Sequence, residues 1–423
     1  MINEAPLSQF QSLGDGLVRP IYADYSFGNI PNTIEFLLTG AERGPLLPAA
    51  CFAGTSYPRP QKVVLFFVDS FAWQFWCQYR HQFRTLRRVS EEGTLTPLSA
   101  LFPSTTAASV STLNLGVLPA QHALYEWNIY IPAYGEVIQS LAFTPLGRHL
   151  PDACARLGYD PTKLLEVHET VHQRLGRKGV RSIQFAHRSY ATSAYNSVAT
   201  AGAEIVRHST LAEALVQLKE CLLATPGKAL LSFYWAAIDA IAHTHGPGSS
   251  YHAAEIANFW HTVDAVFDAV AAPDTLYLFT ADHGHVRADA RDTLYLNEAL
   301  PALRDCLPLS PTGKPIYPNG SPRDVFLHVK PRLRAQVLGL LEEALAGEAV
   351  VLSMADALQH GLFGSGAISD ELRRRLGDIL VLPYLGRFIW WREPGRLENH
   401  FHGHHGGLTR EEMTTLLGVI DRL

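Results

Sequence analysis

Three short runs of apolar residues, none of them alternating with polar residues, stand out along the chain. They cover residues 63–68, 229–235 and 275–280. Runs of this length are typical of strands that are buried on both faces, as in a parallel sheet covered by helices. Apolar residues at helical spacing predict helices over residues 211–223, 253–270 and 333–346. The alternation predicts an α/β fold: a doubly wound, mostly parallel sheet with helices on both faces.

An acidic residue follows each predicted strand. Asp69 comes directly after the first strand, and Asp239 and Asp282 come shortly after the second and third. Ligands of open α/β sheets bind at the carboxyl ends of the strands, so we expect these three side chains at one rim. The alternative for Asp69 is a strand-end aspartate that caps the following helix.

The domain organisation is predicted from the length of the chain and from its segments rich in proline and glycine. The 423 residues exceed the roughly 100–200 of an average domain, and we expect a single domain over residues 1–423 with cap-like insertions. The insertions are expected at about 151–226, which mixes histidine, arginine and small residues, and at about 287–385, which has Pro/Gly punctuation. From about Arg410 the chain predicts a final helix, acidic and then apolar.

Composition narrows the classes of protein. A net charge of −5 argues against a nucleic acid polymer as partner, and no apolar run reaches the roughly 18 residues of a membrane span. The first residues contain no basic segment followed by an apolar stretch, so we expect no signal peptide. Five scattered cysteines without a CxxC pair fit a reducing compartment. We therefore expect a cytoplasmic protein that binds no membrane. Because the chain has 19 histidines and only five cysteines, we expect His, Asp and Glu to be the ligands of any bound metal ion.

A turn rich in hydroxyl groups follows the first strand region. Phe102-Pro103-Ser104-Thr105-Thr106 leads into a segment of small residues that is expected to be helical. A hydroxyl group at a helix N-terminus lies near the positive end of the helix dipole and near free backbone N–H groups, which favour an alkoxide and a bound phosphate. The alternative is an ordinary Ser/Thr cap.

Two carboxylate–imidazole pairs follow the second and third strands. Asp239 and His243 are four residues apart, so on a helix both point from one face and can bind one metal ion. Asp282-His283-Gly284 lies at the end of a buried strand. The alternatives are a polar pair on a solvated helix face and a turn with a hydrogen-bonded histidine.

The third candidate is a histidine tract near the C-terminus. Residues 400–405 contain four histidines, and neighbouring glycines allow close approach of the backbone. The alternative is a flexible surface tract, and at most one or two of these histidines are expected to bind metal.

The set of three aspartates, about three histidines and one hydroxyl group at one rim is what a two-metal phosphoryl-transfer site needs. Two cations about 3.5–4 Å apart stabilise the attacking and the leaving oxygen of an in-line displacement.

Five segments between Val63 and the C-terminus resemble the alkaline phosphatase superfamily, specifically its type I phosphodiesterase/nucleotide pyrophosphatase family. They are the strand ending in Asp69, the Phe-Pro-x-x-Thr segment ending at Thr106, Asp239-x-x-x-His243 before Gly-Pro, Asp282-His283-Gly284, and His405-Gly406.

The resemblance implies two divalent metal ions, which would be zinc, with manganese or iron as alternatives. Asp69, Thr106, Asp282 and His283 would hold one, and Asp239, His243 and His405 the other. Thr106 would attack phosphorus and form a phosphothreonine that water then hydrolyses. Thr105 and Ser104 are neighbouring alternatives for the nucleophile.

The chain departs from the family pattern in two segments. Ala107, Ala108 and Ser109 follow the proposed nucleophile where the family has Phe-Pro-Asn-His. Asn128 is carried over as the group that binds a non-bridging phosphate oxygen, although one extra residue precedes it and Ala123 replaces a glycine.

These features together predict a metal-dependent hydrolase of small phosphoesters, acting on phosphodiester or nucleotide pyrophosphate bonds. The alternatives are a phosphomonoesterase or phosphonate hydrolase on the same scaffold, and a non-catalytic binding protein that retains the fold. A monoesterase would need a cation near the dianionic phosphate, for which Arg323 is a candidate unless it lies on the surface. The segment at Cys306 lacks the arginine of the Cys-x-Pro-x-Arg pattern and lies at a different place in the chain, which argues against a sulfatase.

Overall fold

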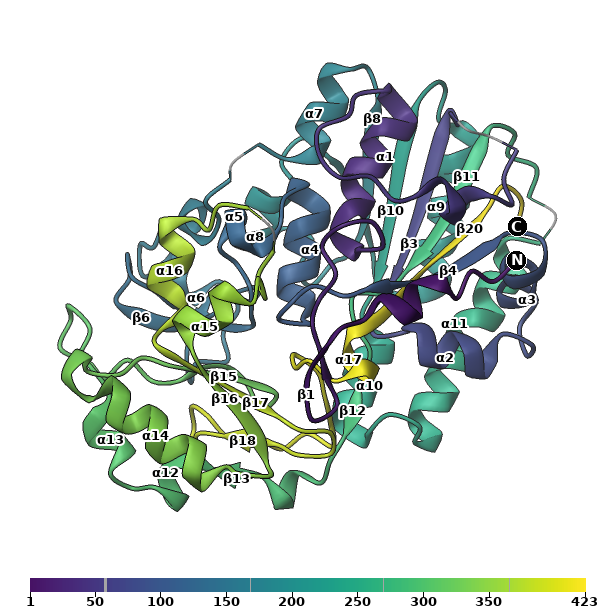
Figure 1. Ribbon diagram of the computed structural model, residues 1–423. Coiled ribbons are helices and arrows are strands. Elements are labelled where there is room, and N and C mark those ends of the chain that lie inside the picture. Colours follow the sequence, from purple (N-terminus) through teal and green to yellow (C-terminus); the bar gives the residue numbers. More distant parts are fainter. Residues whose placement is uncertain (57–58, 168, 269, 365) are drawn as a thin grey trace.

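The computed structural model describes residues 1–56, 59–167, 169–268, 270–364 and 366–423. Residue 269 of the expected helix 253–270, and residues 168 and 365 of the two expected caps, lie outside these ranges. A seven-stranded sheet forms the centre of the fold, in the order β4-β20-β11-β3-β10-β8-β9 (Figure 1). Its strands are β3 (Lys62–Val68), β4 (Thr94–Ser99), β8 (Arg181–His187), β9 (Glu204–His208), β10 (Ala229–Trp235), β11 (Thr275–Thr280) and β20 (Thr414–Ile420).

The sheet is mostly parallel, as the three apolar runs predict. These runs form β3, β10 and β11, and β11, β3, β10, β8 and β9 pair in parallel in that order. Strand β20 runs antiparallel to both β11 and β4. The α/β fold with a doubly wound sheet is therefore confirmed.

Helices cover both faces of this sheet because its strands are apolar on both sides. Val64, Phe66 and Val68 of β3 pack into the same cluster as side chains of α2 (Trp73–Tyr79), α3 (Arg84–Glu91), α9 (Leu211–Ala224) and α11 (Ser250–Val266). Leu65 and Phe67 face the opposite way, toward α1 (Ile30–Thr39), α4 (Thr106–Leu115) and α7 (Val171–Arg177). Within the described ranges, no helix has both the length and the apolar character needed to cross a membrane.

A second sheet lies beside the first, with the order β16-β17-β15-β14-β5-β6-β7 (Figure 1). Its strands are β5 (Asn128–Ile131), β6 (Glu136–Gln139), β7 (Thr144–Pro145), β14 (Asn319–Ser321), β15 (Asp324–Leu327), β16 (Ala349–Ser353) and β17 (Ile379–Pro383). Residues 287–385, expected to form a cap, thus supply four strands of this sheet as well as the expected helix α14 (Arg334–Ala344). The other expected cap, 151–226, supplies β8 and β9 to the central sheet, so we retain the cap proposal for 287–385 only.

The expected final helix is wrong beyond its first turn. Helix α17 spans only Arg410–Met413, and the apolar run after it forms strand β20. All seven residues of β20 are buried, because the strand lies between β11 and β4. The run contains the β-branched residues Thr414, Thr415, Val419 and Ile420, which fit a strand, and pairing on both sides decides its conformation.

His208, at the end of β9, is a buried histidine without a hydrogen-bond partner on either ring nitrogen. It packs near the rings of Phe233 and Trp235, and burial lowers its pKa to about 4. Below about pH 6.5, His208 is protonated in the unfolded chain but stays neutral in the folded protein. The free energy of unfolding therefore decreases by up to about 1.4 kcal/mol per pH unit until about pH 4.

We therefore expect His208→Phe to change the free energy of unfolding more favourably at pH 5 than at pH 7.5, because phenylalanine fills the same apolar site without a proton-binding group. Urea unfolding at both pH values measures this difference. An equal effect of the substitution at both pH values would show that folding leaves the pKa of His208 at its ordinary value.

Candidate metal centre

The carboxyl ends of β3, β10 and β11 lie in register at one edge of the central sheet. Val68 pairs with Trp235, and Phe67 pairs with Thr280. Asp69 follows β3 directly, Asp282 follows β11 after one residue, and Asp239 lies in the first turn of α10 (Ala237–His245). The strand register therefore brings the three predicted aspartates to one rim.

Asp69, Asp282 and His283 form the first group of side chains that could hold a metal ion, with all three residues buried. His283 Nε2 lies 3.2 Å from an Asp282 oxygen and 3.7 Å from an Asp69 oxygen. Thr106 completes the group, since its Oγ1 lies 3.3 Å from Asp69 Oδ2 and 3.3 Å from His283 Nε2. Thr106 is the first residue of α4, behind the cap residue Thr105.

Asp239, His243, His285 and His405 form the second group. Asp239 is central, with its oxygens 2.7 Å from His285 Nε2, 3.4 Å from His243 Nε2 and 3.8 Å from His405 Nε2. Backbone carbonyls fix two of the imidazoles through hydrogen bonds to the ring nitrogen that faces away from Asp239. His243 Nδ1 donates to Gly403 O at 2.8 Å, and His405 Nδ1 donates to Ser104 O at 2.8 Å. Such partners orient the other ring nitrogen toward a metal ion.

The two groups adjoin each other. The His283 and His405 rings stack with centroids 3.5 Å apart, although each ring belongs to a different group. All seven side chains predicted as metal ligands thus lie at one site, four in the first group and three in the second. This division of the ligands between two groups is the one that the family resemblance predicts.

His285 was missed by the sequence prediction. It follows Asp282-His283-Gly284 directly, and its ring lies within 4.7 Å of that of His243. A second histidine two residues after the first was the available signal. Of the C-terminal tract, His405 is in the second group, whereas His404 packs against His243 with ring centroids 4.8 Å apart and His400 is exposed.

Two glycines allow the backbone segments to meet here. A Cβ atom on Gly284 would lie 1.9 Å from Glu411 O, and one on Gly403 would lie 2.4 Å from Ala242 O. Both contacts are with backbone, which cannot give way easily. These glycines therefore hold the two histidine segments against α17 and α10.

Electrostatics favour cations at this site. Burial, together with Asp282 and Asp239, raises the pKa of Asp69 well above its usual range. Burial and His283 lower the pKa of His405 well below its usual range, which leaves its imidazole neutral and able to bind metal. Three buried carboxylates close together repel one another unless positive charge is added.

One buried oxygen of the first group supports a fit to metal ions. Asp282 Oδ2 is buried and makes no hydrogen bond, and His283 Nε2 of the same group lies 3.2 Å from it. A buried carboxylate oxygen without a hydrogen bond is costly, and a cation bound between Asp282 and His283 removes that cost. Nitrogen and oxygen donors without thiolates suit zinc, and also manganese or iron.

Tyr234 is a further residue that touches this group. Its hydroxyl donates to Asp69 Oδ2 at 2.5 Å, and Ser70 N donates to Asp282 Oδ1 at 3.1 Å. Both contacts fix carboxylates that could bind metal. Burial, together with the negative charge of Asp69, raises the pKa of Tyr234 well above its usual range, so the phenol remains a donor.

Ser104 and Thr105, the alternative nucleophiles, are occupied elsewhere. Ser104 Oγ donates to Gly407 O at 2.9 Å, and Thr105 Oγ1 donates to Tyr125 O at 2.8 Å while accepting from Ala108 N. Both side chains are buried. The geometry therefore favours Thr106 as the reactive hydroxyl group.

Asn128 lies at the start of β5, where its side-chain amide donates to Gly320 O at 3.0 Å. One of its N–H donors is thus used within the second sheet, and its role toward phosphate stays a prediction. Glu126, two residues earlier, is buried and close enough to His283 for their charges to interact. Burial raises the pKa of Glu126 to about 7.

Arg323 is neither on the surface nor free to bind phosphate. It is fully buried, and its Nε and one terminal nitrogen each donate to Glu412 at 2.9 Å. The remaining donors bind the carbonyls of Pro383, Tyr384 and Arg387. Arg323 therefore holds the C-terminal turn against the second sheet, and its charge is neutralised by Glu412.

Replacing His285 by alanine is expected to weaken metal binding at the second group by about 10–100-fold, because Asp239 loses its nearest imidazole. Titration of the metal-free protein with zinc, followed by calorimetry, measures the affinity. His404→Ala is the matched control, since His404 lies beside the group without belonging to it. Equal loss in both variants would remove His285 from the metal centre.

The sequence model of the type I phosphodiesterase / nucleotide pyrophosphatase family matches residues 63–408. No curated protein matches by sequence.

Solved structures resemble the fold at low sequence identity. Murine ectonucleotide pyrophosphatase/phosphodiesterase 5 aligns with a TM-score of 0.62 and 16% identity over 84% of this chain and 87% of its own. An inactive threonine-to-alanine variant of that murine protein, solved with AMP, aligns equally well. Phosphonoacetate hydrolase from Sinorhizobium meliloti, solved with phosphonoacetate, aligns with a TM-score of 0.60 and 17% identity over 88% of this chain and 94% of its own.

Proposed function

The chain belongs to the type I phosphodiesterase / nucleotide pyrophosphatase family of the alkaline phosphatase superfamily, and from this premise we propose that it hydrolyses phosphodiester or nucleotide pyrophosphate bonds at a two-zinc centre through a phosphothreonine. It is a metal-dependent phosphate-ester hydrolase. The observation that carries the proposal is the Thr106 hydroxyl, 3.3 Å from both Asp69 and His283 at the start of a helix.

The reaction we propose has two displacements. Thr106 Oγ1 attacks phosphorus, a P–O bond to Thr106 forms, and the bond to the leaving oxygen breaks. The intermediate is a phosphothreonine that still carries the second arm of the substrate. Water then cleaves its P–O bond to Thr106 and releases that arm as a phosphomonoester, so the configuration at phosphorus is retained. Two zinc ions would supply positive charge that favours the Thr106 alkoxide and stabilises the leaving oxygen.

The residues of the chain position these events. Thr105 caps α4 and leaves the N–H groups of Thr106 and Ala107 without partners inside the helix, as at every helix start. In the proposed reaction these donors would stabilise the charge that a phosphoryl oxygen next to Thr106 gains. Tyr234 and Ser70 hold Asp69 and Asp282 in place.

A diester fits this site better than a monoester. A monoester carries a second negative charge that needs a cation, and Arg323, the candidate cation, is occupied by Glu412. We expect purified enzyme to hydrolyse bis(p-nitrophenyl) phosphate with a higher kcat/KM than p-nitrophenyl phosphate. The reverse ranking would assign the protein to the phosphomonoesterases.

The relatives indicate what else to include in the assay. Murine ectonucleotide pyrophosphatase/phosphodiesterase 5 binds AMP in one structure, and the Sinorhizobium enzyme binds phosphonoacetate. A panel of nucleotide diesters, pyrophosphates, monoesters and phosphonates therefore separates the proposed activity from its alternative, phosphonate hydrolysis. A non-catalytic role would show as binding without turnover across the whole panel.

A further inference from the structure

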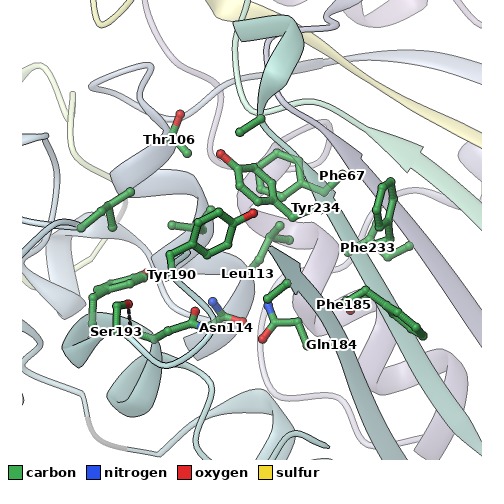
Figure 2. A pocket seen from close by; sticks show the side chains of 18 of the residues that line it. Phe67, Thr106, Leu113, Asn114, Gln184, Phe185, Tyr190, Ser193, Phe233 and Tyr234 are labelled. Atoms are coloured by element: carbon green, nitrogen blue, oxygen red, sulfur yellow. Dashed lines mark hydrogen bonds between the residues drawn. The ribbon is translucent and has the colours of Figure 1, made fainter. Parts of the chain in front are cut away.

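A cavity of about 430 Å³ opens beside the reactive threonine and extends away from it into the fold. Thr106 lines one end, and Asn114 and Gln184 lie at the other (Figure 2). The cavity lies between one face of the central sheet and helices α4, α7 and α8 (Ala194–Ala199). Its volume is within the range of pockets that bind small molecules.

The walls are apolar and aromatic. Phe67, Leu113, Tyr190 and Tyr234 are among the side chains between the two ends, and the rings of Tyr190 and Tyr234 touch edge to face (Figure 2). Val110 and Leu113 point from α4 into this space and remain only half-buried although they lie on a core-facing helix. Removing such surface from water would favour an apolar ligand.

The cavity has no charged wall. Among the described residues that line it, none is lysine, arginine, aspartate or glutamate. His172 is neutral, because burial lowers its pKa to about 4 and its two ring nitrogens are hydrogen-bonded to Ser182 and Asn114. A second phosphate or a carboxylate would have no partner of opposite charge here.

The far end is polar without charge. The Gln184 side chain projects from β8, and its Oε1 is buried without a hydrogen-bond partner. An unsatisfied carboxamide in an apolar cavity is unfavourable unless a ligand supplies a hydrogen bond. The far end therefore indicates a ligand-binding space rather than a packing void.

We propose that this cavity binds one ester arm of the substrate, an uncharged and largely apolar group that stays on phosphorus while the other arm leaves. The inference rests on the proposed function, since Thr106 must be the attacking group. In-line displacement places the leaving oxygen opposite the attacking Oγ1, so a group directed into a cavity that begins at Thr106 is the retained arm. The preferred substrates are thus phosphodiesters with one neutral hydrophobic arm.

The test is a series of p-nitrophenyl phosphodiesters whose second arm is methyl, butyl, octyl or 7-carboxyheptyl. We expect kcat/KM to rise at least about 100-fold from methyl to octyl, and to be at least about tenfold lower for the carboxylated arm than for octyl. Equal values across the series, or preference for the carboxylated arm, would overturn the proposal.

Variants locate the arm within the protein. Leu113→Trp fills the cavity and should reduce the octyl-to-methyl ratio of kcat/KM to below about ten. Leu223→Trp, an exposed position on α9, is the matched control and should keep the ratio. Gln184→Leu should lower the kcat/KM of an 8-hydroxyoctyl ester relative to the octyl ester.

Failure of the proposed function has a different signature. If no ester in the series is hydrolysed, the methyl ester included, the phosphodiesterase assignment is wrong. The cavity is then tested by calorimetry, in which octyl phosphate should bind at least about tenfold more tightly than methyl phosphate. Equal binding of the two phosphates would overturn the cavity proposal as well.

Discussion

Thr106→Ala is expected to lower the kcat for a chromogenic phosphodiester by at least about 10⁴-fold, because removal of a covalent nucleophile removes the reaction path itself. The hydroxyl is the one hydroxyl group at the start of α4 that faces Asp69 and His283. Its loss leaves the helix cap intact, since Thr105 supplies the cap contact to Ala108 N. Steady-state kinetics with the purified variant measure the effect.

Controls separate loss of the nucleophile from loss of the site. The Thr106→Ala protein should still bind close to two zinc ions per chain, measured by elemental analysis. Thr105→Ala should cost stability, about 1 kcal/mol for a lost helix cap, while it retains more than a tenth of the activity. Thr106→Ala with unchanged turnover, or Thr105→Ala without any, would move the nucleophile to another hydroxyl group.

A trapped intermediate gives a second readout. Rapid quenching in acid of the enzyme with excess diester should preserve a peptide in which Thr106 carries the phosphoryl group together with the retained arm, since phosphate esters of threonine are stable to acid. Mass spectrometry of the digest would identify the residue. Phosphate found on Ser104 instead would contradict the geometry, because that hydroxyl donates to Gly407 O.

Much of this site could be predicted because strand ends and spacing decide it. The apolar runs identify β3, β10 and β11, and parallel pairing in register brings whatever follows these strands to one edge. Asp69 and Asp282 therefore follow from local sequence. The helical spacing of Asp239 and His243 also holds, since both lie on α10.

Other features depend on contacts between distant segments. The sequence predicts a helix from about Arg410 onward, but the helix ends at Met413. The apolar residues after it form strand β20 because they pair with β4 on one side and β11 on the other. Arg323 has an ordinary local sequence, and its burial follows from Glu412, which lies 89 positions away. The cavity beside Thr106 is lined by residues from seven separate stretches of chain between Pro31 and Ala236, so no local pattern could predict its shape.

Removal of the metal ions is the other prediction with a large expected effect. Exhaustive chelation should abolish turnover, and zinc should restore it, because the groups of Asp69 and Asp239 supply only nitrogen and oxygen donors that suit this ion. Activity that survives complete chelation, with metal content verified by elemental analysis, would remove the two-metal mechanism.

The same chelation experiment has a consequence for stability that does not depend on activity. Without cations, burial and the neighbouring carboxylates raise the pKa of Asp69, so the metal-free protein keeps repelling charges or binds a proton at this site. A metal ion that binds only the folded state adds about 4 kcal/mol at a thousandfold excess over its Kd. Zinc should therefore raise the Tm of the metal-free protein in a concentration-dependent way.

Single-ligand variants show that this stabilisation comes from the two groups. Asp69→Asn should remove binding at the first group and Asp239→Asn at the second, so each variant should bind about one zinc ion and show a smaller rise in Tm. Because Asp69→Asn removes a buried negative charge that Asp282 and Asp239 repel, the metal-free Asp69→Asn protein should be at least as stable as the metal-free parent. A parent protein whose Tm does not respond to zinc would show that these buried carboxylates are satisfied without metal.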